Sequence, residues 1–350
     1  MTIETPDLKF EPKGLFIGGE WVGAKSGESF QTINPSNSEL LGVVPAADEA
    51  DVDYAVAAGK AAFDDWSRMG VSKRAAYLNQ LADAIDANAE HLALMDAVDS
   101  GNAYSGMLGD MKWTSDTYRY FAGLVTEMKG ETMSRQPGHL NLTLRQPYGV
   151  VAKINPFNHP FRFCAEKAAS ALAAGNTVVI KGPEQAPLSS LRFGEIAEQI
   201  LPPGVINILT GDGRTGSAMV RHKDVNRIGF VGSVETGRKI AVDAAPGLKE
   251  VTLELGGKNP IIIFPDADPK KAAAAAVKAM NMSRQGQSCS STSRVLVHAS
   301  LHSAVVEEMV RIVRSISIGM PWLEDVDMGP IVSEQQYDRI LNFVAFGQEL

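Results

Sequence analysis

The sequence predicts an α/β protein, in which a parallel sheet with crossover helices is followed by a second, smaller α/β unit. Two observations lead to this prediction. Short apolar runs alternate with helical stretches from Gly149 onward, and the same alternation starts again near Gly257. Strands that alternate with helices in this way form parallel sheets, because each helix returns the chain to the end of the sheet where the next strand begins.

The chain before Gly149 is predicted to be mainly helical. A short apolar run with a Gly-Gly turn predicts a hairpin at residues 15–22. Helices are predicted at 51–66, which is rich in alanine, at 72–95, where Leu and Ile recur at helical spacing, and at 113–121. Apolar and polar residues alternate over 140–147, which predicts a half-buried strand.

The alternating part of the chain supplies the strands of both sheets. Four runs rich in Val and Ile predict the first sheet: 150–154, 177–180, 205–209 and 228–231. The helices between them are predicted at 161–174, 188–199 and 216–221. The second unit is predicted from a strand at 260–264, a helix at 269–280 and a strand at 294–297.

Composition limits the partners of the chain. With 33 basic and 41 acidic residues its net charge is −8, which argues against nucleic acid or an anionic membrane surface. Its start is polar and acidic, and no apolar run is long enough to span a bilayer. Two cysteines form no disulfide framework, so we expect a reducing compartment, the cytoplasm. No metal site is predicted.

The two cysteines lie in different settings. Cys164 is on an alanine-rich helical stretch, where a free cysteine is usually a small core residue. Cys289 follows Gly286, Gln287 and Ser288 and precedes two serines, a polar setting that favours a nucleophile. Glu254 is the polar member of an apolar strand that runs into a Gly-Gly pair. We expect that strand to desolvate its carboxylate and suit it to take a proton from water.

Asn158 lies in a rigid turn between a strand and a helix. Pro156 and Pro160 bracket it, and asparagine in such a turn is usually only a turn former. Beside a thiol nucleophile, its side-chain amide becomes a candidate donor to an oxyanion. One such donor contributes about 2.7–4 kcal/mol to transition-state stabilisation.

Two glycine-containing junctions indicate a nucleotide site. Gly211, Gly213 and Gly216 fit G-x-G-x-x-G between a strand and a helix, and Gly232-Ser233 forms a similar junction. The first motif alone is a weak signal, because glycines also make ordinary turns. Lys181 and Glu184 follow the strand 177–180, where they can hold the hydroxyls of an adenosine ribose or simply form a surface ion pair.

With these residues in place, the chain resembles the NAD(P)-dependent aldehyde dehydrogenase superfamily. The resemblance rests on LELGGKNP, on GQSC with a following Arg294, on GNTVVIKGPE and on FVGSVETG, and it extends from Phe16 to Gln336. It implies a Rossmann-like cofactor domain, a catalytic α/β domain and a small β-hairpin oligomerisation arm. The implied domains are 1–133 with 149–256 for NAD, 134–148 for the arm, and 257–350 for the incomplete catalytic domain.

The resemblance also implies roles for individual residues. Cys289 is the implied nucleophile, Glu254 the base that activates water, Asn158 the oxyanion amide and Lys167 a lysine near the active site. The implied cofactor contacts are Ile154, Pro156, Lys181, Glu184, Gly213, Gly216, Phe230, Gly232, Ser233 and Leu255. In the family the glycine-rich turn at 211–216 is not used for phosphate as in ordinary Rossmann enzymes.

The sequence also departs from the family. Relatives continue for a substantial C-terminal part, which holds a Glu-X-Phe-Gly-Pro motif and a strand that joins the oligomerisation sheet. We therefore expect this chain to be a fragment, folded in part and poorly active. The homodimer or homotetramer expected of the full-length family is doubtful for it.

The expected substrate is a small-molecule aldehyde. The implied substrate channel contains His159, Phe163, Glu166, Ser288 and Ser290. With Arg162 nearby, this set suggests a polar or aromatic aldehyde, unless Arg162 and Glu166 simply pair one helical turn apart.

NAD is expected over NADP. A carboxylate at Glu184 repels a 2′-phosphate and accepts hydrogen bonds from free hydroxyls. Two other functions remain open: a CoA-acylating aldehyde dehydrogenase, against which Glu254 argues, and an inactive nucleotide-binding remnant.

Overall fold

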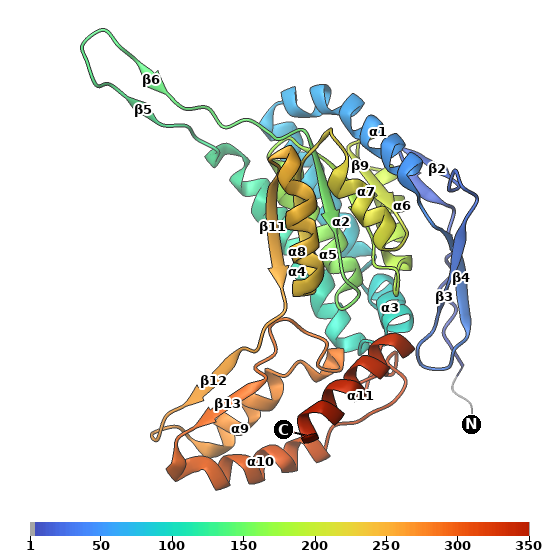
Figure 1. Ribbon diagram of the computed structural model, residues 1–350, viewed down its shortest axis with the longest axis vertical. Coiled ribbons are helices and arrows are strands. Elements are labelled where there is room, and N and C mark those ends of the chain that lie inside the picture. The colour runs from blue at the N-terminus through green and yellow to red at the C-terminus, as the bar shows by residue number, and fades with distance from the viewer. Residues whose placement is uncertain (1–3, 350) are drawn as a thin grey trace.

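The computed structural model describes residues 4–349 and contains a seven-stranded sheet at its centre (Figure 1). The strand order is β11-β10-β7-β8-β9-β1-β2, and the neighbours from β11 to β9 are parallel. The strands are β1 (Leu15–Ile17), β2 (Glu20–Val22), β7 (Val150–Ile154), β8 (Thr177–Lys181), β9 (Ile206–Leu209), β10 (Val225–Gly232) and β11 (Glu250–Leu255). The predicted parallel sheet and the hairpin at 15–22 are therefore confirmed.

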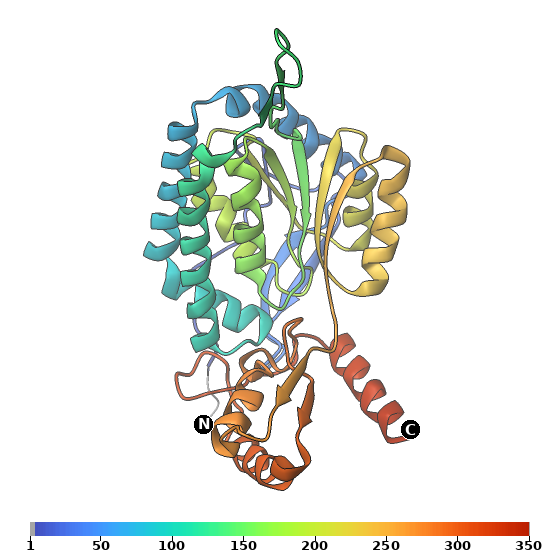
Figure 2. The ribbon, with the colours of Figure 1, turned by 90° about the vertical axis from the view of Figure 1, so that its left-hand side faces the viewer.

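Helices cover both faces of this sheet (Figure 2). On one face lie α1 (Glu49–Arg68), α7 (Gly213–Arg221) and α8 (Val234–Ala244). On the other lie α5 (Pro160–Ala173) and α6 (Leu188–Glu198), backed by α2 (Val71–Ala87), α3 (Ala89–Ser100) and α4 (Tyr104–Leu124). Every residue of β8 and β9 is buried, as expected for strands covered on both sides.

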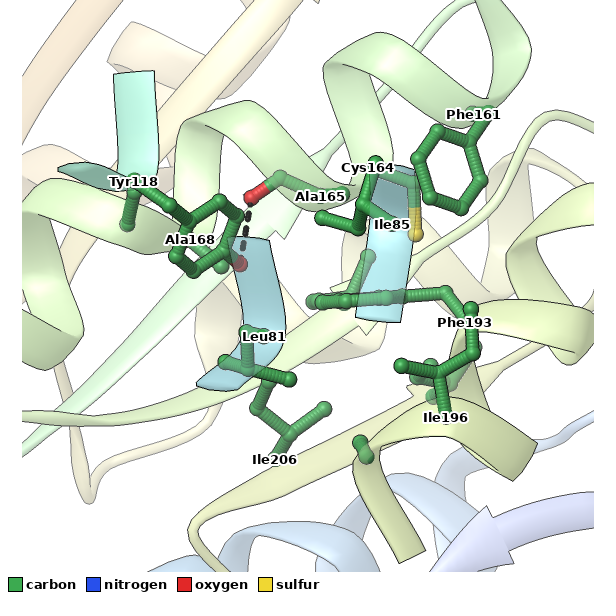
Figure 3. Close-up of a cluster of buried hydrophobic side chains, with 14 of the residues drawn as sticks. Leu81, Ile85, Tyr118, Phe161, Cys164, Ala165, Ala168, Phe193, Ile196 and Ile206 are labelled. Carbon is green, nitrogen blue, oxygen red and sulfur yellow. Dashed lines mark hydrogen bonds between the residues drawn. The ribbon is translucent and has the colours of Figure 1, made fainter. Parts of the chain in front are cut away.

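Side chains of α4, α5 and α6 pack closely in the core beside the central sheet (Figure 3). Phe161 and Phe193 meet edge to face with ring centroids 5.8 Å apart. The hydroxyl of Tyr118 donates a hydrogen bond of 2.8 Å to the carbonyl of Ala165. Cys164 is buried in this cluster, which confirms that it is a core residue.

The chain leaves the central sheet at Leu255 and forms a separate two-stranded parallel sheet (Figure 1). Its strands are β12 (Pro260–Ile263) and β13 (Arg294–Val297), and α9 (Pro269–Lys278) and α10 (His302–Arg314) pack beside them. Ile263, Ala273 and Val305 form a small core. The last helix, α11 (Glu334–Glu349), projects away from this unit (Figure 2).

The half-buried strand predicted at 140–147 is wrong. Only β5 (Thr132–Met133) and β6 (Asn141–Leu142) pair there, at the end of an arm that extends from the body (Figure 1). Leu140 is 67% exposed and Leu144 74%. Alternation predicts burial only where another layer covers the apolar face, and residues 4–349 supply none for the arm.

Two helix predictions also need correction. The single helix at 72–95 is broken at Asn88, whose ψ of 9° ends α2 and starts α3. The helix at 113–121 is longer at both ends, as α4.

The hairpin of β3 (Ser29–Ile33) and β4 (Leu40–Pro45) was not anticipated. No helix within residues 4–349 is long and apolar enough to cross a bilayer.

Candidate active site

Two adjoining cavities open at the carboxyl ends of the central strands β7, β8 and β10. The larger has a volume of about 780 Å³ and the smaller about 310 Å³. They share Pro156, Phe157, Val231, Gly232 and Ser233 as a common wall. In open α/β sheets this end of the strands is where ligands bind.

The larger cavity collects nearly all of the residues predicted for the cofactor. Those that line it are Ile154, Pro156, Lys181, Glu184, Gly213, Gly216, Phe230, Gly232 and Ser233. Leu255 does not line it, because its side chain packs towards Gly237 at the start of α8. Strand ends and glycine junctions had indicated Lys181, Glu184 and the glycines of this set, the family resemblance implied the rest, and the topology brings them together.

Lys181 is the buried cation of the larger cavity. Its Nζ donates to the carbonyl of Gly182 at 3.2 Å. Burial lowers the pKa of this amine, while the charges of Glu184 and Asp212 act in the opposite direction. Glu184 accepts a hydrogen bond from Gln185 at 2.9 Å and is only half-buried, so its carboxylate remains available to a ligand.

The two helix starts at this cavity differ in charge. At α7, the carboxylate of Asp212 accepts from the amide of Arg214 at 2.8 Å, so a negative group already occupies that end. At α8, the uncharged hydroxyl of Ser233 caps the amide of Thr236 at 3.2 Å. A helix N-terminus favours an anion, and the cap of α8 is uncharged, while Glu235 in its first turn pairs with Lys239 at 2.8 Å. The geometry therefore favours Ser233 over the 211–216 turn as the phosphate contact.

The smaller cavity brings the catalytic candidates together. Asn158, Glu254, Ser288 and Cys289 all line it, although they come from three separate parts of the chain. Asn158 follows β7, Glu254 is near the end of β11, and Cys289 lies in the loop between α9 and β13. Sequence reasoning assigned these residues to one reaction, and the fold places them around one space.

Cys289 is exposed in a loop with unusual backbone geometry. Asn281 and Gln285 have φ angles of 55° and 54°, in the left-handed region that few side chains favour. The side-chain amide of Asn259 donates to the carbonyl of Cys289 at 2.7 Å, which fixes the peptide next to the thiol. The loop is thus an ordered support for an accessible thiol.

Asn158 keeps its side chain available to a ligand. Its backbone carbonyl accepts from the amide of Asn102 at 3.2 Å, which anchors the turn. Its side-chain Oδ1 is buried and has no hydrogen-bond partner among the described residues. A buried polar atom without a partner costs free energy, so a ligand or water at this position would be stabilising.

The expected desolvation of Glu254 is wrong for this chain. Glu254 is exposed, because β11 is the edge strand of the sheet and its polar side chains face outward. The carboxylate also borders a third cavity of about 430 Å³, together with Lys167, Lys153 and Glu166. Lys167 therefore lies on the far side of Glu254 and does not line the smaller cavity.

The predicted substrate channel is only partly open. His159 and Phe163 are buried, and their rings are 4.9 Å apart. Arg162 pairs with Glu166 at 2.6 Å, which is the pairing one helical turn apart that the sequence had left open. Ser288 and Ser290 lie within 3.1 Å of each other in the Cys289 loop.

Sequence reasoning missed several residues of the site. Gln336 and Arg339 reach the smaller cavity from α11, and nothing in their amphipathic helix indicated this contact. Asp110 and Arg284 form a buried ion pair at 2.8 Å that joins α4 to the Cys289 loop. Among residues 4–349, no group of three or more His, Cys, Asp or Glu side chains is placed to hold a metal.

The comparison with known proteins agrees with this geometry. Residues 21–349 match the profile of the aldehyde dehydrogenase family. The chain belongs to this family. It is 41% identical to aldehyde dehydrogenase family 2 member C4 of Arabidopsis thaliana, with 99% of this chain and 70% of the plant protein covered.

Two further aldehyde dehydrogenases illustrate the match. The chain is 39% identical to aldehyde dehydrogenase tropH of Talaromyces stipitatus, over 96% of this chain and 66% of that protein. The solved NAD⁺ complex of an aldehyde dehydrogenase from Bacillus cereus is 39% identical and superposes with a TM-score of 0.94, over 98% of this chain and 70% of that one. The chain thus spans roughly two thirds of the length of such relatives.

Proposed function

We propose that this chain carries the site for NAD-dependent oxidation of an aldehyde to a carboxylic acid, with Cys289 as the covalent nucleophile. The observation that carries the proposal is the smaller cavity, where Asn158, Glu254 and Cys289 meet beside the larger one. A thiol, a water-activating carboxylate and an amide donor are the groups that thioester chemistry needs.

The larger cavity fits a dinucleotide. Lys181 and Glu184, which line it, are the proposed contacts of the adenosine ribose, and Ser233 with the α8 N-terminus is the proposed contact of the pyrophosphate. The solved Bacillus cereus relative is described as an NAD⁺ complex, which supports the same cofactor here. When bound, NAD accepts the hydride that leaves the substrate carbon.

The chain's own residues account for the remaining steps. The thiolate of Cys289 adds to the carbonyl carbon, and the Asn158 side-chain amide stabilises the oxygen that becomes negative. Loss of hydride restores the C=O bond and leaves a thioester on Cys289. Glu254 takes a proton from water as the water attacks the thioester, and the C–S bond breaks to release the acid and the thiolate.

The decisive experiment follows NADH formation by the 350-residue chain with NAD and a panel of aldehydes. We expect whatever turnover this chain shows to be abolished by Cys289→Ala and retained by Cys164→Ala, because only Cys289 lines the cavity. Turnover that survives in Cys289→Ala would refute the covalent mechanism. NAD binding without aldehyde-dependent labelling of Cys289 would favour the nucleotide-binding remnant.

Hydrolysis and CoA acylation are distinguished at Glu254. We expect Glu254→Gln to accumulate an acyl-enzyme, visible by mass spectrometry, because water is no longer activated. Turnover that depends on CoA and does not need Glu254 would instead support the acylating enzyme.

The substrate proposal is a polar or aromatic aldehyde. Arg162 lies over the ring of Trp113 at 4.8 Å, so the region next to the Asn158 turn combines aromatic and charged groups. Higher kcat/KM for long aliphatic aldehydes than for hydroxylated, amino or aromatic ones would contradict this. A preference for NADP would likewise contradict the role of Glu184.

Several wider features remain proposals. We infer the domain boundaries 1–133 with 149–256, 134–148 and 257–350 from the separate sheets and the projecting arm. The exposed leucines of the arm support the homodimer or homotetramer expected of the full-length family, and the composition supports a cytoplasmic location.

A further inference from the structure

The strongest unassigned feature is a buried cluster of charges around Asp110 in α4. Asp110 is 3% exposed, yet its carboxylate has partners from two other parts of the chain. Its Oδ2 lies 2.5 Å from Nδ1 of His159, and its Oδ1 lies 2.8 Å from a guanidinium nitrogen of Arg284. A second guanidinium, of Arg162, lies 3.4 Å from Oδ1.

The charge of Asp110 is well compensated. Burial alone raises the pKa of a carboxyl group, but the hydrogen bond from His159 and the positive charges of Arg284 and Arg162 outweigh it, so the pKa of Asp110 is lowered. Burial also lowers the pKa of His159, while the hydrogen bond to Asp110 and its negative charge act in the opposite direction. The cluster therefore contains an ionised Asp110 that pairs with His159 and with Arg284.

One partner of Asp110 lies in the segment that leads to Cys289. Arg284 ends the short helix η3 (Met282–Arg284), and it also donates to the carbonyl of Gly106 at 3.2 Å. Two further contacts hold this segment to the same region: the amide of Ala103 donates to Ser283 at 2.9 Å, and Gln285 donates to the carbonyl of Gly101 at 2.5 Å.

The other partner of Asp110 lies next to the proposed oxyanion amide. His159 follows Asn158 directly, and Asn102 holds the carbonyl of Asn158 at 3.2 Å. The region from Gly101 to Asp110 thus contacts both the Asn158 turn and the Cys289 loop. The two segments also meet directly, because Nε of Arg284 lies 3.1 Å from the same Nδ1 of His159, and the carboxylate of Asp110 bridges both side chains.

We propose that Asp110 is a positioning residue, whose carboxylate holds the Cys289 loop and the Asn158 turn at a fixed separation through Arg284 and His159. The proposal rests on the proposed function, because it assigns the reacting thiol and the oxyanion amide to these segments. Asp110 itself lines neither the larger nor the smaller cavity, so it acts through its two partners.

The first test measures the loop directly and needs no turnover. Asp110→Asn and Arg284→Gln in the full chain are compared by amide hydrogen exchange and mass spectrometry over residues 282–291 and 156–163. We expect exchange at 282–291 to rise about tenfold in both variants, because a lost anchor lets the loop open locally.

Asp99→Asn is the matched control. Asp99 is also fully buried, in α3, but it accepts from Thr32 and from the amide of Leu188 at 3.0 Å and contacts neither His159 nor Arg284. We expect this variant to lose stability without selective exchange at 282–291. Equal exchange in the Asp99 and Asp110 variants would mean that Asp110 is merely structural and would overturn the proposal.

The second test uses kinetics. We expect Asp110→Asn to lower kcat about tenfold with the KM for NAD nearly unchanged, since misplacement of reacting groups affects chemistry more than cofactor binding. Arg284→Lys should retain more activity than Arg284→Gln because it keeps the charge, and the double variant should be no worse than either single one. Additive losses, or a loss confined to KM, would refute positioning by this pair.

Failure of the two proposals is distinguishable. If Cys289→Ala retains turnover, the proposed chemistry is wrong whatever Asp110 does. If Cys289→Ala abolishes turnover and the exchange of residues 282–291 is insensitive to Asp110→Asn, the chemistry stands and the positioning role is wrong.

Discussion

Asp96 should make the stability of the chain depend on pH in an unusual direction. This α3 residue is fully buried, and its Oδ2 accepts from the amide of Phe161 at 3.1 Å at the start of α5. Burial, together with the negative charges of Asp110 and Asp99, raises the pKa of Asp96 from its ordinary value of 3.8 to about 8. The folded chain therefore keeps a proton that the unfolded chain has released.

Proton linkage gives the sign and the size of this pH dependence of stability. Between the unfolded and folded pKa values the folded state binds more protons, so its stability falls as pH rises, by up to about 1.4 kcal/mol per pH unit. The contribution is complete below the unfolded pKa and is lost as pH rises through the folded pKa of about 8. Between pH 6 and pH 8, Asp96 should lower the free energy of unfolding by about 2 kcal/mol.

Urea unfolding at pH 6, 7 and 8 tests this, with the fluorescence of buried Trp66 as a probe of the same core. We expect Asp96→Asn to flatten the pH dependence, because the amide cannot lose the proton. Tyr118→Phe is the control, since it should lower stability at every pH without changing the slope. Equal slopes in the wild-type and Asp96→Asn chains would refute the reasoning.

Three other predictions can be checked with single variants or reagents. Tyr118→Phe removes a buried hydrogen bond of 2.8 Å and should cost about 1 kcal/mol in urea unfolding; an unchanged midpoint would contradict this. Gly211→Ala should cost about 1–3 kcal/mol, because Gly211 has φ of +151° and an added Cβ would lie 2.1 Å from a side-chain oxygen of α7. Gly213→Ala, with nothing within 4 Å, is its control and should fold normally. A thiol reagent at pH 8 should label Cys289 in the native chain and Cys164 only after unfolding, since burial raises the pKa of Cys164 to about 12. Labelling of both thiols at equal rates would show that the core around α5 is open.

The fold could be predicted where a short apolar run forms a strand that is buried on both of its faces. The β7 and β8 strands are continuous apolar runs between helices, so both their existence and their parallel pairing followed from the sequence. The prediction of a half-buried strand at 140–147 was wrong for the opposite reason. Alternation shows which residues share a face, but it does not show whether another layer covers that face. The break at Asn88 lies between two helical patterns in register, so periodicity did not detect it.

The site could be predicted only in part. Cys289, Glu254 and Asn158 stand out by residue type and setting, and the fold brings them to one cavity. The exposure of Glu254 depends on the position of β11 at the edge of the sheet, which no short stretch of sequence specifies. Asp110 and Arg284 are far apart along the chain, and a charged residue on a helix is ordinarily a solvated one.

The wide spacing of the site residues has a consequence for biosynthesis. Asn158 and Glu254 emerge from the ribosome well before Cys289, and the strands that carry them can pair before the thiol exists. The cavity closes only when the loop after α9 docks against the junction of α3 and α4. The Cys289 thiol can therefore join Asn158 and Glu254 at the cavity only after the strands that position those two residues have been synthesised.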